Sequence, residues 1–178
     1  SQPAPGKRFG SHSETIELEA FMQFVEKLDI RTDVMLEVKD KNLSAQKCRI
    51  ALEGCNVRDL EEEWARYKYS VLEASPTGYQ EIRRFLKNKR DPSCKEFYNK
   101  IETALKTEPT PGHFINAASH VWGYHKKRAT PEEAKEFNRL LQRYERGSGS
   151  QGSIKKYLWE LTCMYPNPYL FQSYYFAL

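Results

Sequence analysis

The sequence lacks long apolar runs and contains little cysteine. No stretch of the 178 residues approaches the 18 consecutive apolar residues of a membrane-spanning helix, so we expect no transmembrane segment. No basic and apolar leader opens the chain, so we do not expect export. The four cysteines are scattered and include no Cys-x-x-Cys pair. Reduced thiols in a cytoplasmic protein are therefore the simplest interpretation.

The composition is that of a polar chain that folds. Hydrophobic residues make up 39% and charged residues 29%, and the mean hydropathy is −0.77. The aromatic content of 13% argues against disorder. The length suits one ordinary domain, or one domain and a fragment of another.

The net charge of +4 is unevenly distributed along the chain. Residues 1–50 carry equal numbers of acidic and basic side chains, and residues 51–63 carry a net charge of −4. From residue 64 onward the chain contains nineteen basic and eleven acidic residues, which gives a net charge of +8. A basic second part suits a partner with a phosphate backbone, although it is equally common on solvated helices.

The first 54 residues follow the pattern of an α/β unit. Apolar residues at helical spacing predict a helix over residues 14–28, and Val34, Leu36 and Val38 predict a strand over residues 32–39. A second helix is expected to end near Gly54. Helix, strand and helix in this order indicate a fragment of a protein with a parallel sheet.

From about residue 60 the pattern is helical only, and proline marks most of the boundaries. Helices are predicted to start after Ser75, after Asp91, near Pro111, after Thr130 and near Ser153. The fold class is thus mainly α, with a compact domain of about six helices after the helix–strand–helix fragment. The composition of residues 147–153 predicts a flexible loop, natural or engineered. The expected core residues are Trp64, Phe85, Phe97, Ile101, Trp122, Phe137, Leu141, Leu158 and Leu161.

His12 and Glu37 are the candidate metal ligands. Alternation along the predicted strand places Glu37 on the face opposite Val34, Leu36 and Val38. The pattern alone favours an exposed pair of Glu37 with Lys39, and an isolated loop histidine is usually a surface residue. A histidine with a carboxylate is nevertheless a ligand set for Zn²⁺, Mn²⁺ or Fe²⁺.

A family resemblance favours the metal-ligand interpretation of His12 and Glu37 over the surface interpretation. The segments "GKRFGSHSETIELEAF" and "DVMLEVKDKNLSA" resemble the end of the catalytic barrel of UV damage endonucleases. In that family a histidine in a glycine-rich loop and a glutamate in the following strand are metal ligands, so the resemblance implies these roles for His12 and Glu37. It implies divalent metal ions, with Mn²⁺ expected, and Lys7 and Arg8 near DNA. It covers residues 1 to about 52, and the family's remaining ligands lie upstream of this stretch.

A second resemblance covers the chain from about Trp64 to its end. "WARYKYSVLEASPTGYQEIRRFL", "INAASHVWGYHKKRATPEEAKEF" and "YPNPYLFQSYYF" resemble a bacterial domain of unknown function that also occurs fused to thiouridine desulfidase-like proteins. Those fusions imply an accessory role in nucleic-acid binding. The sequence departs from the family at residues 148–153. We therefore predict a fragment of a TIM-barrel endonuclease over residues 1–54 and a helical accessory domain over residues 60–178.

Two basic clusters are the candidate nucleic-acid contacts of the helical part. The first contains Arg83, Arg84 and Lys87, followed by Lys89 and Arg90, and the second contains Lys126, Lys127 and Arg128. Tyr79 and Tyr124 are available for base stacking. An ordinary solvated face explains the clusters equally well.

Histidines in the same region suggest a further site. His120, Tyr124 and His125 lie close in sequence, but no Cys or acidic residue falls at ligand spacing beside them. A histidine satisfied inside the fold is the favoured interpretation.

Two functions are considered, the first implied by the family resemblances and the second by the charge pattern. The first is the C-terminal part of a metal-dependent UV-damage DNA endonuclease, acting on damaged duplex DNA in repair, with its helical domain binding nucleic acid. The second is a non-catalytic module that binds nucleic acid or protein. With two ligands only, residues 1–178 alone are expected to be inactive. No membrane partner is expected.

Overall fold

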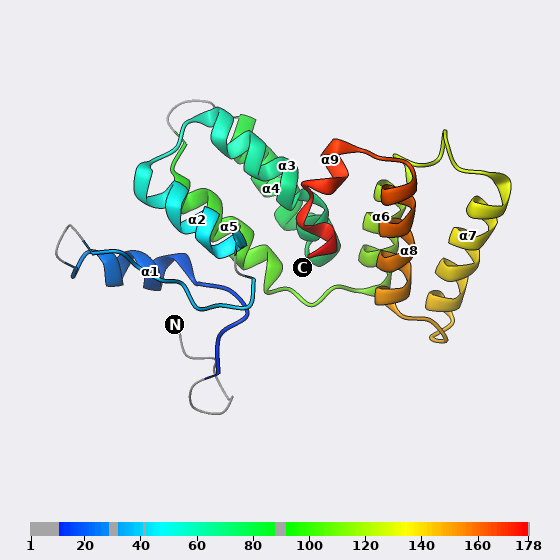
Figure 1. Ribbon diagram of the computed structural model, residues 1–178, viewed down its shortest axis with the longest axis horizontal. Helices are drawn as coiled ribbons and strands as arrows, with labels where there is room; N and C mark the ends of the chain where they lie inside the picture. Colours follow the sequence, from blue (N-terminus) through cyan, green and yellow to red (C-terminus); the bar gives the residue numbers. More distant parts are fainter. Residues whose placement is uncertain (1–10, 29–31, 41, 88–91, 178) are drawn as a thin grey trace.

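The computed structural model describes residues 11–28, 32–40, 42–87 and 92–177. Over these residues it contains nine α-helices, one short 3-10 helix and no strand (Figure 1). The helices are α1 (Leu18–Val25), α2 (Asn42–Glu53), α3 (Val57–Ala74), α4 (Pro76–Lys87), α5 (Cys94–Leu105), α6 (Pro111–Trp122), α7 (Pro131–Glu145), α8 (Gln151–Met164) and α9 (Pro168–Phe171), followed by η1 (Tyr174–Phe176). None of the described helices combines the length and apolar character needed to span a bilayer.

Side-chain caps define the start of most helices. Thr130 accepts a hydrogen bond from the Glu133 amide and the Glu133 carboxylate accepts one from the Thr130 amide, which confirms the predicted capping box of α7. α5 begins slightly later than predicted, because the Ser93 side chain accepts from the Glu96 amide. α8 begins slightly earlier, because Ser150 caps it.

The prediction of a strand at residues 32–39 was wrong. Residues 32–38 form no regular secondary structure, and Val34 and Met35 are exposed. A strand exists only where its backbone groups pair with a neighbour. Within the described residues this segment pairs only at its end, where the Lys39 and Asp40 amides donate to the Ser13 and Glu14 carbonyls at 3.1 Å. No fragment of a barrel is present in the part of the chain that the structure describes.

α3 is the central helix of the fold. Leu60, Tyr67 and Val71 on one side of it pack in a core cluster with residues of α1, α2, α4 and α5. Tyr69 and Leu72 on another side pack in a second cluster with residues of α6 to α9 and η1. Figure 1 shows α3 between α2 and α5 on one side and α6 and α8 on the other.

The first core cluster crosses the predicted domain boundary. Ile16 and Leu18 of the N-terminal segment and Cys48 of α2 share it with Phe97 and Ile101 of α5. The described parts before residue 54 and after residue 60 therefore pack together. The assignment of the two segments to different domains stays a prediction.

The predicted core is confirmed in part. Phe97, Ile101, Phe137, Leu158 and Leu161 are almost completely buried. The other four predicted core residues are only partly buried at the edges of the two clusters; they are Trp64, Phe85, Trp122 and Leu141.

The expectation of four reduced thiols was wrong for one pair. Cys55 and Cys94, 39 residues apart, form a disulfide between the turn before α3 and the start of α5, while Cys48 and Cys163 are free. α3 and α5 pack against each other, which brings the two cysteines together. Closing a loop of this length restricts the unfolded chain and stabilises a fold by about 4 kcal/mol in the chain-entropy model.

Residues 147–150 form a defined turn and residues 151–153 begin α8, so the loop is shorter than predicted. The Gly147 amide donates to the Tyr144 carbonyl and the Ser148 amide to the Arg143 carbonyl, the two hydrogen bonds of a Schellman motif. Gly147 has a φ of +72°, which favours glycine. A Cβ on Gly149 would lie 2.9 Å from the Tyr144 amide nitrogen. Both glycines are therefore required by the backbone.

This turn gives a stability test with an internal control. Gly149→Ala should lower the free energy of unfolding by about 1–3 kcal/mol, because backbone atoms must move to admit the methyl group. Gly152→Ala should raise it by up to about 1 kcal/mol, since this helical glycine has open space around its Cβ position. Urea denaturation of both variants measures the difference. Equal effects from the two substitutions would contradict the described turn.

Candidate functional site

The two predicted metal ligands lie close together. The backbone pairing of residues 13–14 with residues 39–40 sets the N-terminal segment beside the segment that contains Glu37. His12 Nδ1 lies 3.9 Å from Glu37 Oε2, and the two side chains are 50% and 56% exposed. Two segments 25 residues apart in sequence thus present a nitrogen and an oxygen donor on one surface.

The pair fits part of a metal site. Metal–nitrogen and metal–oxygen distances are about 2.0–2.2 Å for a transition-metal ion, and two donors of one tetrahedral ion therefore lie closer together than 3.9 Å. The two exposed side chains would have to approach each other slightly to share a cation. The described residues contain no group of three or more His, Cys, Asp or Glu placed to hold a metal. Two exposed donors make a weak site, so a tight one requires further ligands. The assignment of His12 and Glu37 as ligands stays a prediction.

The basic cluster on α4 is exposed. Arg83, Arg84 and Lys87 form no ion pair with any described residue, and the Arg83 guanidinium lies 5.7 Å from the centre of the Tyr79 ring. Tyr79 also packs against Trp64, with ring centres 5.3 Å apart. Lys7, Arg8, Lys89 and Arg90 lie outside the described residues.

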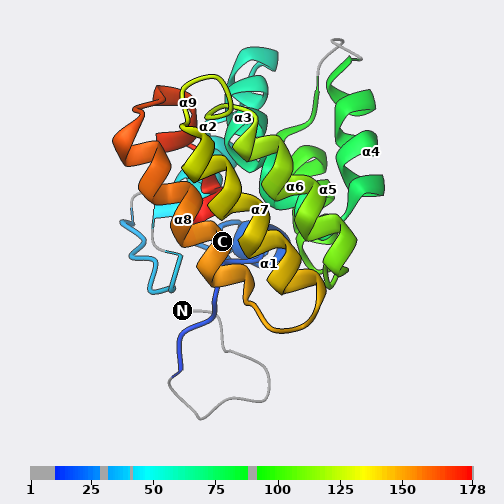
Figure 2. The same ribbon diagram turned by 90° about the vertical axis from the view of Figure 1, so that its right-hand side faces the viewer.

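The second basic cluster occupies the turn between α6 and α7. Lys126, Lys127 and Arg128 are exposed and form no ion pair with a described residue. Arg128 donates to the Pro166 carbonyl at 3.4 Å and lies 5.2 Å from the centre of the Tyr165 ring. Figures 1 and 2 both show this turn well apart from α4, so the clusters are two separate patches.

The histidines and Tyr124 have structural partners. His125 is buried, and its Nε2 lies 3.2 Å from Thr162 Oγ1. Burial lowers the pKa of this imidazole, so it is neutral near pH 7. The Tyr124 hydroxyl is hydrogen-bonded to the Tyr69 hydroxyl at 2.7 Å, and its ring is stacked on Tyr169. His120 is exposed and lies 6.4 Å from the Tyr69 ring. The predicted histidine with a hydrogen-bond partner inside the fold is thus His125, and not His120.

Sequence patterns did not reveal the most buried ion pair. Lys47 of α2 is 3% exposed, and its ammonium lies 2.6 Å from Glu102 Oε1 of α5. The same ammonium donates to the Ile16 carbonyl and to Thr15 Oγ1, and Glu102 Oε1 accepts from the Leu18 amide. One lysine therefore joins the N-terminal segment to two helices. The one sequence signal for this burial is the spacing in α2, because Lys47 lies on the same helix face as the buried Leu43 and Ile50.

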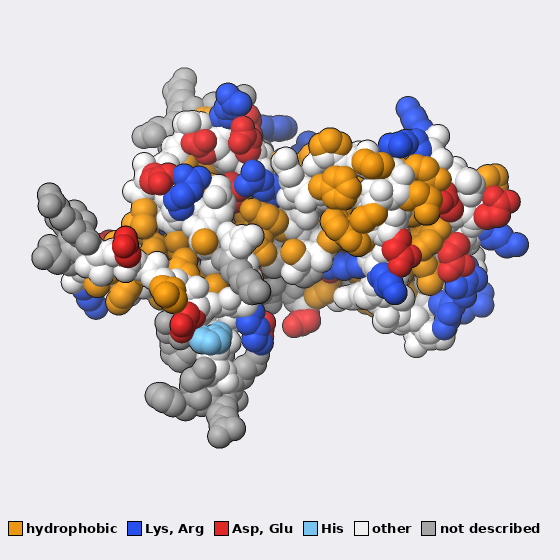
Figure 3. Space-filling view, viewed as in Figure 1, with side chains coloured by type: hydrophobic (Ala, Val, Ile, Leu, Met, Phe, Trp, Pro, Cys, Tyr) orange, Lys and Arg blue, Asp and Glu red, His pale blue; other side chains and the backbone are white. Residues whose placement is uncertain are grey.

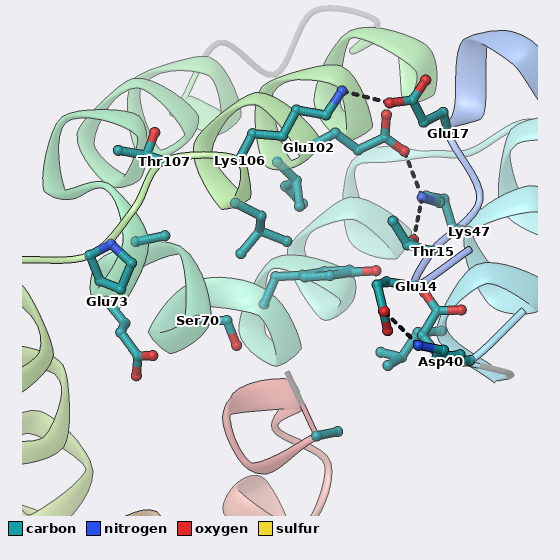
Figure 4. Close-up of a pocket in the computed structure, with 18 of the residues that line it drawn as sticks. Glu14, Thr15, Glu17, Asp40, Lys47, Ser70, Glu73, Glu102, Lys106 and Thr107 are labelled. Atoms are coloured by element: carbon teal, nitrogen blue, oxygen red, sulfur yellow. Dashed lines mark hydrogen bonds and ion pairs between the residues drawn. The ribbon is translucent and has the colours of Figure 1, made fainter. Parts of the chain in front are cut away.

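Next to this pair is a cavity of about 510 Å³ (Figure 4). It is lined by residues of the N-terminal segment, the turn at residues 39–40, α2, α3, α5 and the connection that follows it, α8, and Ala177. Its lining combines apolar side chains with nine charged residues. Neither the predicted metal ligands nor the two basic clusters line it.

The described fold and surface define a helical protein with two separate basic patches and an exposed His–Glu pair. The chain belongs to the family described as protein of unknown function (DUF1722), whose model matches residues 68–178. That match confirms the resemblance expected for the helical part.

A second comparison extends beyond this family. The chain is 28% identical over 144 residues to a UV DNA damage endonuclease of Clostridium perfringens (strain 13 / Type A). The aligned part is 78% of this chain and 34% of that protein, so the chain spans about a third of the length of the curated relative it matches. No solved structure matches the chain significantly.

The buried ion pair gives a direct test of the packing at this site. Lys47→Met should cost about 3–5 kcal/mol of unfolding free energy, because it leaves the Glu102 carboxylate without its cation inside the fold. Lys106→Met is the matched control, since the Lys106–Glu17 pair is 66% and 56% exposed and should contribute about 0–1 kcal/mol. Chemical denaturation of both variants checks this. If the two variants were equally stable, Lys47 would not be the link described above.

Proposed function

We propose that this chain is the C-terminal part of a metal-dependent endonuclease that nicks damaged DNA in repair. The observation that carries the proposal is the pair of His12 and Glu37, 3.9 Å apart, in a chain with similarity to a UV DNA damage endonuclease. The coverage of about a third of that relative fits a catalytic site completed by residues that precede this segment.

The two side chains suit the chemistry of phosphodiester cleavage. A divalent cation, with Mn²⁺ expected, would supply a water of lowered pKa and would stabilise charge on the scissile phosphate. Glu37 would contribute a negatively charged oxygen and His12 a neutral nitrogen to its ligand set. Because both side chains are about half exposed, a DNA backbone can approach them.

The helical domain is proposed to bind nucleic acid. Arg83, Arg84 and Lys87 form one exposed patch without described ion pairs, and Lys126, Lys127 and Arg128 form another. Unpaired basic side chains can neutralise phosphates and release condensed counterions. The separation of the patches suits contacts with two stretches of backbone. A non-catalytic module with this binding alone is the second candidate, favoured by the lack of a third metal donor among the described residues.

The endonuclease proposal first requires a longer protein. The coding sequence that precedes residue 1 should encode further His, Asp and Glu ligands. In that longer protein, Glu37→Ala should remove most nicking of irradiated duplex DNA, because one ligand is lost. Glu26→Ala, an exposed carboxylate at the end of α1, is the matched control and should retain activity.

The assay measures nicking of an irradiated plasmid in the presence of Mn²⁺. Residues 1–178 alone should bind Mn²⁺ or Zn²⁺ weakly and should not nick. Wild-type activity of Glu37→Ala would show that this carboxylate is not a ligand. A reading frame that supplies no upstream ligands would favour the non-catalytic module.

Nucleic-acid binding should follow the salt dependence of phosphate contacts. The logarithm of the affinity should fall linearly with the logarithm of the salt concentration, with a slope of about −0.9 per duplex phosphate contacted. Changing Arg83, Arg84 and Lys87 together to Glu should weaken binding to all sequences alike. If each contacts one phosphate, the slope should flatten by about 2.7. The same change at Lys126, Lys127 and Arg128 tests the second patch.

Fluorescence anisotropy with duplex, single-stranded and tRNA probes measures these affinities. The matched control reverses three exposed lysines that already have acidic partners, namely Lys95, Lys106 and Lys156. This control variant changes the net charge by the same amount, but its salt dependence should stay steeper than that of the patch variant, because the phosphate contacts remain. Identical slopes for the patch and control variants would mean that net charge alone attracts the probe. No binding at low salt would leave both patches as solvated surface.

A further inference from the structure

An exposed aromatic cleft lies between α8 and the C-terminal elements α9 and η1. Its volume is about 520 Å³, and its rings are those of Trp159 of α8, Phe171 of α9 and Phe176 of η1. Trp159 and Phe171 are 38% and 45% exposed. Figure 3 shows apolar side chains gathered over α8 and α9. Contiguous apolar surface of this kind often marks a binding site.

The three rings leave ring faces open. Trp159 meets Phe171 edge to face, with ring centres 5.6 Å apart and an interplanar angle of 84°. It is tilted by 59° against Phe176, with ring centres 5.1 Å apart. Rings that meet at such angles do not fully cover each other's faces, so a further planar ring can stack on them. A nucleobase is such a ring, and stacking on aromatic side chains accepts any base.

Two lysines lie among these rings. Lys155 and Lys156 line the cleft together with Trp159, from the same side of α8. The cores of protein–protein interfaces are depleted of lysine, whereas lysine beside exposed aromatic rings is typical of surfaces that bind single-stranded nucleic acid. Lys155 is paired with Glu73 and Lys156 with Glu160. Contacts with phosphates are therefore expected from a neighbouring surface.

The second basic patch adjoins the cleft. Arg128 donates to the Pro166 carbonyl and lies on the Tyr165 ring, so this patch sits against the connection from α8 to α9. Phe171 follows Pro166 by five positions, which span at most about 18 Å. About five nucleotides cover that distance at roughly 3.4 Å each. One short strand can thus reach the patch with its phosphates and the cleft with a base.

We propose that the aromatic cleft binds an unpaired base of a single-stranded nucleic acid whose phosphates contact the second basic patch. The inference rests on the nucleic-acid binding proposed above for the helical domain, and it adds a contact with bases. A single strand should therefore bind more tightly than a duplex of the same length, because the bases of a duplex are already stacked and paired. The cleft is separate from the pair of His12 and Glu37.

The test compares two single strands of equal charge. A thymidine oligonucleotide of about 12 nucleotides carries bases, and an abasic strand of the same length carries the same phosphates without them. Fluorescence anisotropy with the 178-residue chain at low salt should show about five-fold or more tighter binding of the thymidine strand, the lower end of what stacking of one base contributes. A uridine strand of equal length shows whether RNA is bound as well.

Variants separate stacking from general apolar contact. Trp159→Leu removes the aromatic ring and should weaken binding of the thymidine strand by about five-fold or more, whereas Trp159→Phe keeps a ring and should weaken it less. Neither variant should change binding of the abasic strand, which also reports that both are folded. Met164→Ala changes an exposed apolar residue of α8 outside the cleft, so this control should bind as the parent chain does.

The outcomes that would overturn this proposal differ from those that would overturn nucleic-acid binding itself. Equal affinity for the thymidine and abasic strands would leave the basic patches as the whole binding surface. Unchanged affinity of Trp159→Leu for the thymidine strand would place any base contact elsewhere. If that variant instead abolished self-association of the chain, the cleft would be a protein contact. No binding of either strand would overturn both proposals.

Discussion

The buried ammonium of Lys47 determines where the N-terminal segment lies. Taking a lysine out of water costs several kcal/mol unless acceptors replace its hydration. Here Glu102 supplies the opposite charge, and the Ile16 carbonyl and the Thr15 hydroxyl supply two further acceptors. These acceptors come from α5 and from the N-terminal segment, so the lysine is satisfied only when both are docked on α2. The segment is thereby part of the fold.

The docked segment accounts for the position of the candidate metal ligands. Residues 13 and 14 accept the amides of residues 39 and 40, and His12 continues this pairing toward Glu37. The pair therefore depends on packing some distance away, at Lys47. The space-filling view shows one surface histidine side chain beside an acidic and a basic side chain (Figure 3). The N-terminal segment that carries His12 thus shares one core cluster with α2 and α5.

The helical part of the fold was readable from the sequence because its signals are local. Thr130 with Glu133, and proline at the first position of α4 and α7, act within one helical turn. The strand was not predictable in this way, since an apolar run such as Val34–Val38 forms a strand only beside a partner strand. The turn at Gly147 was misjudged because its glycine and serine content resembles a linker, although the spacing of these residues satisfies a C-cap.

The features missed from the sequence all depend on contacts between distant segments. The Cys55–Cys94 disulfide and the Lys47–Glu102 pair join residues 39 and 55 positions apart. Lys47 resembles any solvated lysine until α5 and the N-terminal segment enclose it. The cavity is likewise lined by several elements far apart in sequence, and single residues such as Ser70 or Asp40 give no sign of it. His12 and Glu37 were found through a family resemblance, since the residue pattern alone favoured surface roles.

Native-state amide hydrogen exchange tests the central claim, which is that the N-terminal segment is docked through Lys47. The Ile16 amide donates to Ser44 Oγ at 2.8 Å and the Leu18 amide to Glu102 Oε1 at 3.1 Å. If the segment is part of the fold, both amides should exchange only through large openings, with protection comparable to that of Val71 in α3. Exchange of Ile16 and Leu18 near the rate of an unstructured peptide, with Val71 protected, would contradict it.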